Sequence, residues 1–550
     1  MRPDETTPSR KPSAAANLST QREPAVPPRH VLDKVSGRVL DPGTALQVKG
    51  VRPRSTVYVG PRLTISRRGD VTTQVTQLAE VADGLGWDLD VADLERDVPT
   101  HRGRLGVVRV ELTVKDRRAT IAPDGWVLLQ QARARFGLEA MRGVGLDHLV
   151  TLRGLDPNPV HDPNPVHDPN PVHDPNPVHD PNPVHDPNPV HDPNPSGAAL
   201  SAAVASYGRQ GSGGRQPVAF VGHAPVRSPE DRFEAHRRPV VGVLDTGCGA
   251  HPWLTAAVNR GTEIDGRPIG YVDDQTDPER WPDQVGPLDG GIDEYSGHGT
   301  FICGLVHQAC PDADILTWRI VGSDGPIVES DLIDTLSDIA ELARRHRDGE
   351  DGGHPLDVLS LSMGYYHETP EDELFDATMH DILRLLGECG VVVVCSAGND
   401  ATARPMFPAA FAPWVDGQGP LPADADAVPV VSVGALNPNG TEALFSNTGP
   451  WVRAFAPGAS LVSTMPAFQG GWQPMVRTEA YQRTRETADP DDYSGLFALW
   501  SGTSFAAPLL AGRLAAQLVR ELPAPSDTEP ASAAVARAWN AVSAVTGITP

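Results

Sequence analysis

A run of proline-rich repeats divides this chain and sets the first limit on how it can fold. The hexapeptide DPNPVH occurs six times from Asp156 onward, and a seventh DPNP closes the run at Pro195. Proline at every second or third position excludes helix and central strand and favours an extended, polyproline-like chain. A tract of this length could span up to roughly 120 Å at the polyproline rise. We therefore predict a spacer between two folded parts.

The histidines of the repeats offer a second interpretation. The repeat period equals two polyproline turns, so these side chains fall on one face of the extended chain: His161, His167, His173, His179, His185 and His191. Metal binding is the functional alternative to a plain linker. Because an extended chain does not bring its ligands together, we favour the linker. Alanine, serine and glycine continue it, and we bound the linker at residues 156–237.

The part after the linker alternates apolar runs with helical patterns. Apolar runs occupy 240–244, 315–321, 357–364, 391–399 and 428–435, and helical patterns occupy 331–347 and 371–388. Such alternation predicts right-handed βαβ crossovers and a mostly parallel, doubly wound α/β sheet with helices on both faces. We place this domain at residues 238–522, with a C-terminal tail at 523–550 that contains a short helix. Two stretches, 414–428 and 469–497, look like insertions. The second could border a cleft, but a solvated loop is the favoured interpretation.

The part before the linker has the pattern of a small α+β domain at residues 56–155. A strand pattern is followed by a helical one, then by a half-buried strand at 108–114, a second helix after Pro123 and a closing strand LDHLVTL. The order is approximately β-α-β-α-β, with room for one more strand near Trp87. Residues 1–55 are expected to form a disordered tail.

The stretch Leu499–Leu518, LWSGTSFAAPLLAGRLAAQL, places Ser504 at a helix N-terminus. Unpaired backbone N–H groups and the positive end of the helix dipole favour a developing negative charge there. We expect Pro508 to lie in the first turn of this helix, where its missing N–H costs little. A serine at such a position becomes a nucleophile only if a base removes its proton.

Two further motifs supply a base and a group to orient it. His298 stands between glycines in SGHGTFICGLV, at the start of an apolar helical run. Asp245 ends PVVGVLDTG, an apolar run typical of a buried parallel strand. The carboxylate is therefore expected at the carboxyl end of a strand, where open α/β sheets place their active sites.

The motifs DTG, GHGT, SAGN and GTSFAAP, in that order, resemble the signature of the subtilisin-like serine endopeptidases over roughly residues 238–520. The resemblance implies that Ser504 is the nucleophile, His298 the general base and Asp245 the orienting carboxylate. It also implies that Asn399 donates to the oxyanion. Substrate would then bind along Ser362, Met363 and Gly364 and against a pocket wall formed by Ser396, Ala397 and Gly398.

The expected function is a serine endopeptidase that works through an acyl-enzyme and is made as a zymogen. A transpeptidase or peptide cyclase on the same fold, in which an amine replaces water, stays open. A non-catalytic binding protein is the third alternative. This chemistry requires no cofactor, and the sequence leaves open whether structural calcium or any other metal is bound.

The N-terminal domain resembles the propeptides of this family in its order of elements and in its position. Residues 1–155 contain 24 basic and 18 acidic residues, a net charge of 24 − 18 = +6. The rest of the chain then carries −25 − 6 = −31. Opposite charges favour docking, so we expect this domain to act as an intramolecular inhibitor, with an unrelated regulatory or binding domain as the alternative. The other expected partner is a peptide or protein substrate. The overall negative charge argues against nucleic acid or an anionic membrane as a partner.

Location and cysteine content give weaker indications. The first 30 residues contain no apolar run typical of a signal peptide, and no stretch reaches the length of a membrane span. Five cysteines leave at least one thiol unpaired, which suits a reducing compartment. We therefore expect a cytoplasmic location, with export by a route not readable in the sequence as the alternative. Cys248 and Cys303 lie close in sequence to Asp245 and His298, so a bulky thiol reagent could inhibit the enzyme indirectly.

Overall fold

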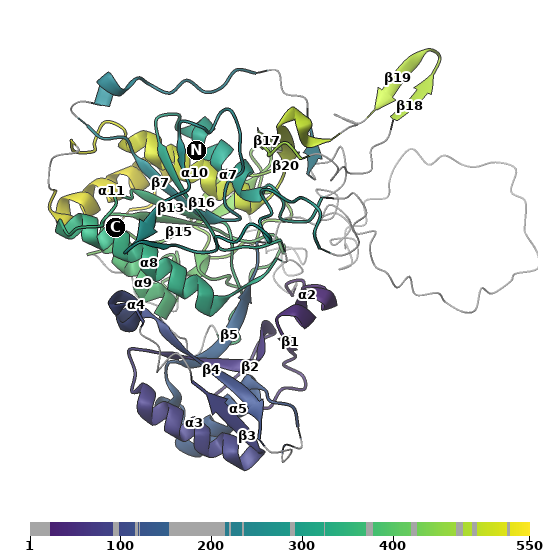
Figure 1. The fold of residues 1–550 in the computed structure, drawn as a ribbon, viewed down its shortest axis with the longest axis vertical. Helices are drawn as coiled ribbons and strands as arrows, with labels where there is room; N and C mark the ends of the chain where they lie inside the picture. The colour runs from purple at the N-terminus through teal and green to yellow at the C-terminus, as the bar shows by residue number, and fades with distance from the viewer. Residues whose placement is uncertain are drawn as a thin grey trace, which may run out of the picture.

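The structure is a computed structural model, shown in Figure 1. It describes residues 23–91, 98–115, 119, 121–152, 215–218, 222–233, 236–285, 292–323, 325–369, 378–417, 419, 426–468, 477–486, 492–524 and 529–549. The DPNPVH repeats and their histidines lie outside these residues, so both interpretations of the repeats stay predictions.

The N-terminal domain is an antiparallel sheet covered by helices. Its strands are β1 (Gly37–Leu40), β2 (Thr56–Ser66), β3 (Trp87–Asp90), β4 (Val107–Val114) and β5 (Val144–Val150). Its helices are α2 (Arg29–Lys34), α3 (Val71–Leu85), α4 (Thr100–Leu105) and α5 (Gly125–Phe136). The side chains of α3 and α5 join the sheet in one apolar core that includes Leu63, Leu78 and Trp126. The strand expected near Trp87 is β3.

The larger domain carries the remaining elements. Its strands are β6 (Gln216–Pro217), β7 (Val240–Asp245), β8 (Val258–Asn259), β9 (Glu263–Ile264), β10 (Arg267–Pro268), β11 (Asp314–Arg319), β12 (Ile327–Val328), β13 (Val358–Leu361), β14 (Val392–Ser396), β15 (Val431–Leu436), β16 (Ala454–Pro457), β17 (Leu461–Thr464), β18 (Arg477–Ala480), β19 (Arg483–Glu486) and β20 (Phe497–Trp500). Its helices are α7 (His298–Ala309), α8 (Glu329–Asp348), α9 (Thr378–Glu388), α10 (Thr503–Leu518) and α11 (Ala531–Thr546).

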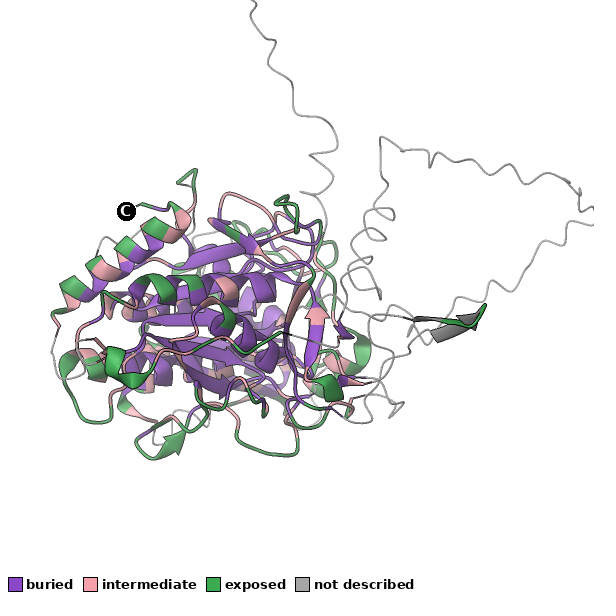
Figure 2. Ribbon diagram, turned by 90° about the horizontal axis from the view of Figure 1, so that it is seen from above, coloured by how far each residue is buried: buried purple, intermediate pink, exposed green. Residues whose placement is uncertain are grey.

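A seven-stranded sheet in the order β16-β15-β14-β13-β7-β11-β8 forms the centre of the larger domain, and its strands pair in parallel. Successive strand residues face opposite sides, so Val392 and Val394 join one apolar core and Val391 and Val393 join the other. Residues of α7 and α10 complete the first core, and residues of α8 and α9 complete the second. The sheet and its flanking helices are largely buried in Figure 2. The predicted doubly wound α/β fold is therefore confirmed.

A strand of the larger domain extends the sheet of the N-terminal domain. Strand β5 of the N-terminal domain pairs antiparallel with β12 of the larger domain, with Leu149 opposite Val328. Immediately after β5, Thr151 and Gly364 exchange both backbone hydrogen bonds at 3.0 Å. In Figure 1 the N-terminal domain accordingly lies against the face of the larger domain that carries α8 and α9.

Two expected boundaries differ from the structure. The disordered tail was expected to reach residue 55, but β1 pairs with β2, so the sheet of the N-terminal domain already begins at Gly37. The short helix expected in a C-terminal tail is α11, whose buried face, including Val535, Ala538 and Val542, joins the core of the larger domain. The sequence pattern did not assign either segment to the domain that it joins, because neither has the strong periodicity of the central elements.

The expected insertion at 469–497 contains the antiparallel hairpin β18–β19, which projects from the body of the molecule in Figure 1. None of the helices in the described part of the chain has the length and apolar content needed to cross a bilayer.

Candidate active site

Asp245 is the last residue of β7, a central strand of the parallel sheet. Its side chain is 1% exposed, and its Oδ1 accepts a hydrogen bond of 2.8 Å from the backbone N–H of Thr246. The carboxyl end of a central parallel strand places this carboxylate at the edge of the sheet where loops converge. The predicted position of Asp245 is therefore the observed one.

His298 is the first residue of α7 and is fully buried. Gly297 before it adopts a left-handed φ of 81°, and a Cβ on Gly299 would lie 2.0 Å from the carbonyl oxygen of Gly247. Both glycines are thus required for the helix to begin this close to the strand end. The ring Nδ1 lies 2.7 Å from Asp245 Oδ1.

The Asp245 contact settles the roles of the two ring nitrogens of His298. Since a carboxylate accepts, Nδ1 is the donor in this bond and Nε2 is left as the basic nitrogen. Among the described residues Nε2 has no hydrogen-bond partner, although it is buried. A buried, unpartnered basic nitrogen is what a general base presents to an incoming hydroxyl group.

Ser504 is the second residue of α10 and is 1% exposed. The ring of the next residue, Phe505, lies 5.2 Å from the ring of His298 between centroids. Helices α7 and α10 also approach closely, because a Cβ on Gly512 would lie 2.6 Å from Ala309 Cβ. Ser504 therefore lies at the N-terminus of a helix whose first turn contacts the ring of His298 through Phe505.

The expectation that Pro508 lies in the first turn is wrong, since α10 begins at Thr503 and Pro508 is its sixth residue. A proline at this position has no N–H to donate to the carbonyl four residues earlier, which is that of Ser504. The hydroxyl of Ser362 donates to this carbonyl instead, at 2.8 Å. The proline thus frees a backbone acceptor that ties α10 to the segment after β13.

Asn399 follows β14 and faces the start of α10. Its Oδ1 accepts from both the backbone N–H and the hydroxyl of Thr503, each at 2.8 Å. These bonds fix the orientation of the amide, with Oδ1 as acceptor and Nδ2 as donor. A Cβ on Gly502 would lie 3.6 Å from Nδ2, so glycine there keeps the approach to this donor clear.

Both predicted substrate-binding segments form hydrogen bonds with the start of α10. Ser362, Met363 and Gly364 continue from β13, and Gly364 pairs with Thr151 of the N-terminal domain. Ser396 ends β14, Ala397 donates to the carbonyl of Val433, and Gly398 donates to the hydroxyl of Thr503 at 3.1 Å. The geometry brings all ten predicted residues to one end of the sheet: Asp245, His298, Ser504, Asn399, Ser362, Met363, Gly364, Ser396, Ala397 and Gly398.

The cysteines near the site are buried free thiols. Cys248 and Cys303 are 8% and 0% exposed. A hydrogen bond with Cys248, followed by burial, raises the pKa of the Cys303 thiol well above its ordinary value. A thiol held neutral in this way reacts slowly, which matches the reading of these cysteines as small buried side chains.

One buried carboxyl group beside the site was missed by the sequence reading. Glu279 is 5% exposed and contacts residues adjacent to both Asp245 and His298. It stands in DPERWPD, a polar and proline-containing stretch that resembles a solvated loop. No local pattern distinguishes it from its acidic neighbours.

A sequence profile of the Subtilase family matches residues 236–545. This match covers more than half of the chain, and the chain therefore belongs to the subtilase family. The resemblance found in the motifs is confirmed.

Several characterised proteins are similar to this chain. An intracellular serine protease of Paenibacillus polymyxa is 27% identical over 297 residues, which cover 51% of this chain and 66% of that protein. The major intracellular serine protease of Bacillus subtilis (strain 168) is 23% identical over 242 residues, 41% of this chain and 60% of that protein. The chain thus spans slightly less than two thirds of the length of these relatives.

Among solved structures, fervidolysin from Fervidobacterium pennivorans, a keratinolytic enzyme related to subtilisin, matches with a TM-score of 0.43 and 17% identity. That match covers 89% of this chain and 60% of fervidolysin.

Proposed function

We propose that this chain is a serine endopeptidase that hydrolyses peptide or protein substrates through Asp245, His298 and Ser504. The observation that carries the proposal is the 2.7 Å contact between Asp245 and His298, with Phe505, the residue after Ser504 at the start of α10, against the imidazole ring. Nε2 of His298 takes the proton of Ser504 as its hydroxyl oxygen attacks the substrate carbonyl. Asp245 stabilises the imidazolium that forms.

The negative charge of the tetrahedral intermediate needs preorganised donors. Nδ2 of Asn399 and the backbone N–H of Ser504 are the two donors that we assign to it, and the N-terminus of α10 adds a favourable dipole. His298 then returns the proton to the leaving amine, and water releases the acyl-enzyme. The substrate backbone would lie along Ser362, Met363 and Gly364, with a side chain against Ser396, Ala397 and Gly398.

We further propose that the N-terminal domain inhibits this site until the chain is processed. Support comes from β5, which pairs with β12 and continues into the two backbone hydrogen bonds between Thr151 and Gly364. Those are the hydrogen-bonding groups that an extended substrate would use. A peptide could therefore enter only after this segment leaves.

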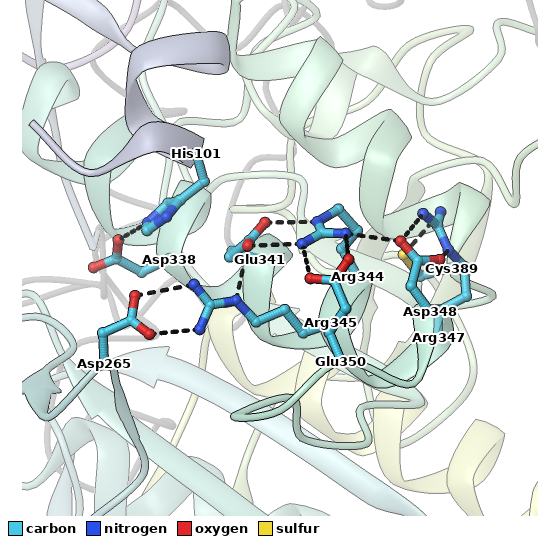
Figure 3. A network of polar contacts seen from close by, with 10 residues as sticks. All are labelled: His101, Asp265, Asp338, Glu341, Arg344, Arg345, Arg347, Asp348, Glu350 and Cys389. Atoms are coloured by element: carbon cyan, nitrogen blue, oxygen red, sulfur yellow. Dashed lines mark hydrogen bonds and ion pairs between the residues drawn. The ribbon is translucent and has the colours of Figure 1, made fainter.

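Charged side chains hold the N-terminal domain on α8. Arg102 forms two bonds with the carboxylate of Asp338, at 2.8 and 2.5 Å, and His101 contacts the same carboxylate at 2.7 Å. Arg109 adds a 2.8 Å bond to Asp331. Figure 3 shows His101 reaching Asp338 at one end of a longer polar network along α8. This pattern accords with a basic N-terminal part and an acidic remainder.

Labelling by a fluorophosphonate tests the catalytic proposal. Purified chain and a Ser504→Ala variant are incubated with the reagent and with a model peptide, and the masses of protein and products are measured. We expect labelling of the native chain alone, at Ser504, and hydrolysed peptide. Ligated or cyclic peptide would indicate a transpeptidase or cyclase. Absence of both labelling and turnover, also after cleavage of the segment that joins the two domains, would leave a binding protein.

We propose a cytoplasmic location, supported by the two relatives that are named as intracellular serine proteases. Export is the alternative, and fractionation of the producing cells followed by immunodetection distinguishes the two. Any bound calcium is likewise open to direct measurement by elemental analysis of the purified chain.

A further inference from the structure

Glu279 is the one acidic side chain in the described part of the chain that bonds residues next to both Asp245 and His298. It precedes His298 by 19 positions and lies in a turn in which Asp277 Oδ1 accepts from the backbone N–H of Glu279, at 2.9 Å. Gly297 donates to the carbonyl of Pro278 at 3.2 Å, which brings the turn against the start of α7. The turn thus delivers a buried carboxylate to the base of the site.

Four donors converge on this carboxylate. Its Oε1 accepts from the hydroxyl of Thr246 at 2.5 Å and from the backbone N–H groups of Gly299 and Thr300 at 2.9 and 3.2 Å. Its Oε2 accepts from the hydroxyl of Thr300 at 2.5 Å. Thr246 directly follows Asp245, and Gly299 and Thr300 directly follow His298. One side chain therefore joins the two backbone segments that carry the Asp–His pair.

Two of these donors are N–H groups of the first turn of α7, which lack partners within the helix. The residue before the helix is Gly297, which has no side chain to cap them. Glu279 supplies the cap from a distant part of the chain, together with a negative charge at the positive end of the helix dipole. His298 stands at that same end of the helix.

We propose that Glu279 is a positioning residue for the catalytic pair. Its carboxylate clamps the segments that follow Asp245 and His298, and its charge favours the imidazolium form of His298 that arises during the reaction. The proposal rests on the proposed hydrolytic function of Ser504. It adds a carboxylate that acts through Thr246 and the start of α7 and does not itself touch the substrate.

The charge of Glu279 depends on pH near neutrality. Burial raises the pKa of Glu279 to about 7, against the hydrogen bonds from Thr246 and Thr300, and the charges of Asp277 and Asp245 raise it further. The other ionisable groups around it are His298 and Cys303 on α7 and Arg319 on β11. A Cβ built on Gly247 would lie within 4 Å of both Arg319 Cβ and Glu279 Cγ. Protonation of Glu279 removes the charge but leaves its hydrogen-bonding shape.

Substitution of Glu279 by glutamine separates its role as a hydrogen-bonded clamp from the role of its charge, because the glutamine amide keeps the shape of the carboxyl group. Its oxygen can accept from Thr246, Gly299 and Thr300, and its NH₂ can donate to the Thr300 hydroxyl. We expect Glu279→Gln to keep the plateau of kcat/KM within about threefold. The midpoint of the acid limb should move to lower pH by about half to one unit, since a nearby anion that favours the imidazolium is lost. The acid limb should also follow one ionisation, that of His298, where the native chain shows two coupled ionisations.

Glu279→Ala removes the clamp as well as the charge. We expect kcat to fall by about 10²-fold with little change in KM, because small misplacements of reacting groups have effects of this size. The matched control is Asp277→Asn, which removes a neighbouring acidic group and keeps its acceptor oxygen. Because the charge of Asp277 contributes to the raised pKa of Glu279, this variant should keep both ionisations of the acid limb and shift its midpoint by less than Glu279→Gln does.

The experiment measures kcat/KM and the rate of fluorophosphonate labelling between pH 5 and 9 for all four proteins, each produced as the full chain and then cleaved in the segment that joins the two domains. An acid limb of Glu279→Gln that superimposes on that of the native chain overturns the proposal. So does an equal shift in Asp277→Asn. If Glu279→Ala fails to fold, the glutamine variant decides alone.

A second readout separates this proposal from the catalytic one. The titration of the His298 ring is followed by NMR in histidine-labelled Ser504→Ala chain, with and without Glu279→Gln. A lower titration midpoint in the double variant supports the role of Glu279 even if no substrate is turned over. An unchanged midpoint refutes that role even if Ser504 proves to be the nucleophile.

Discussion

His148 should make docking of the N-terminal domain depend on pH. It projects from β5 and is 2% exposed. Its Nδ1 lies 2.6 Å from Glu329 Oε2 and its Nε2 lies 2.7 Å from Glu368 Oε2, and both carboxylates belong to the larger domain. Burial alone would lower the pKa of His148, but the two carboxylates outweigh it and raise the pKa to about 10.

The sign of the effect follows from this raised pKa. The contribution of His148 to docking is complete below the ordinary pKa of about 6.5 and is lost as pH rises through about 10. Within that window the docking constant should fall by up to about tenfold per pH unit. Glu368 adds a pH dependence in acid only. Despite its burial, His367 and His148 lower the pKa of Glu368, so its contribution to docking is complete above about pH 4.5 and is lost as pH falls below that value.

Replacing His148 by alanine removes the common partner of two carboxylates. Breaking a buried charge pair from one side costs about 3–5 kcal/mol, so docking should weaken by at least about 10²-fold. The pH dependence between 7 and 9 should disappear in the same variant. His307→Ala is the control, since it removes a buried histidine of α7, on the opposite face of the sheet from α8.

Hydrogen exchange measured by mass spectrometry provides the assay. Full-length Ser504→Ala chain is used so that the two domains stay joined, and exchange is followed in peptides that contain β12 and Gly364. After correction for intrinsic exchange, protection should decrease from pH 7 to pH 9 in the parent and be low at both values in His148→Ala. Equal protection in the two proteins, or protection that does not change with pH in the parent, would refute the reasoning.

Four other outcomes are expected. Ser504→Ala and His298→Ala should abolish turnover while the thermal unfolding midpoint stays close to native, because both side chains act in the transition state. Asn399→Ala should lower kcat by roughly 10²–10³ with little change in KM; a raised KM at unchanged kcat would make it a binding residue instead. Arg102→Ala should weaken docking on the order of tenfold and reduce its salt dependence, measured by the same exchange assay. Deleting four DPNPVH repeats should leave activity and docking nearly unchanged, since effective concentration varies gently with tether length; abolished activity would contradict this.

Much of the larger domain could be predicted because its information is local. The apolar runs that end at Asp245 and before Asn399 are long enough to identify buried parallel strands, and parallel strands bring their carboxyl ends to one edge. The start of α10 at Thr503 was likewise marked by the glycine and the small residues around Ser504. Motifs at such boundaries therefore predict both the fold and the residues that meet at its edge.

Pro508 shows where local rules fail. Proline is costly inside a helix because a carbonyl loses its partner, and this cost alone placed Pro508 in the first turn. The partner that offsets it is the hydroxyl of Ser362, a residue 142 positions earlier. A tertiary contact thus allows Pro508 to lie inside the helix, which the sequence of the helix alone does not predict.

Glu279 extends the same argument to function. Its carboxylate contacts Thr246, 33 positions earlier, and Gly299, 20 positions later, through bonds that form only when the turn packs against α7. In the sequence it is one of several acidic residues between two glycine-rich motifs. Residues that perform the chemistry can be recognised in the sequence, because each must be of one amino-acid type at one position of a motif. A residue that orients them can reach the same atoms from many places in the chain, so it becomes visible only when the contacts are known.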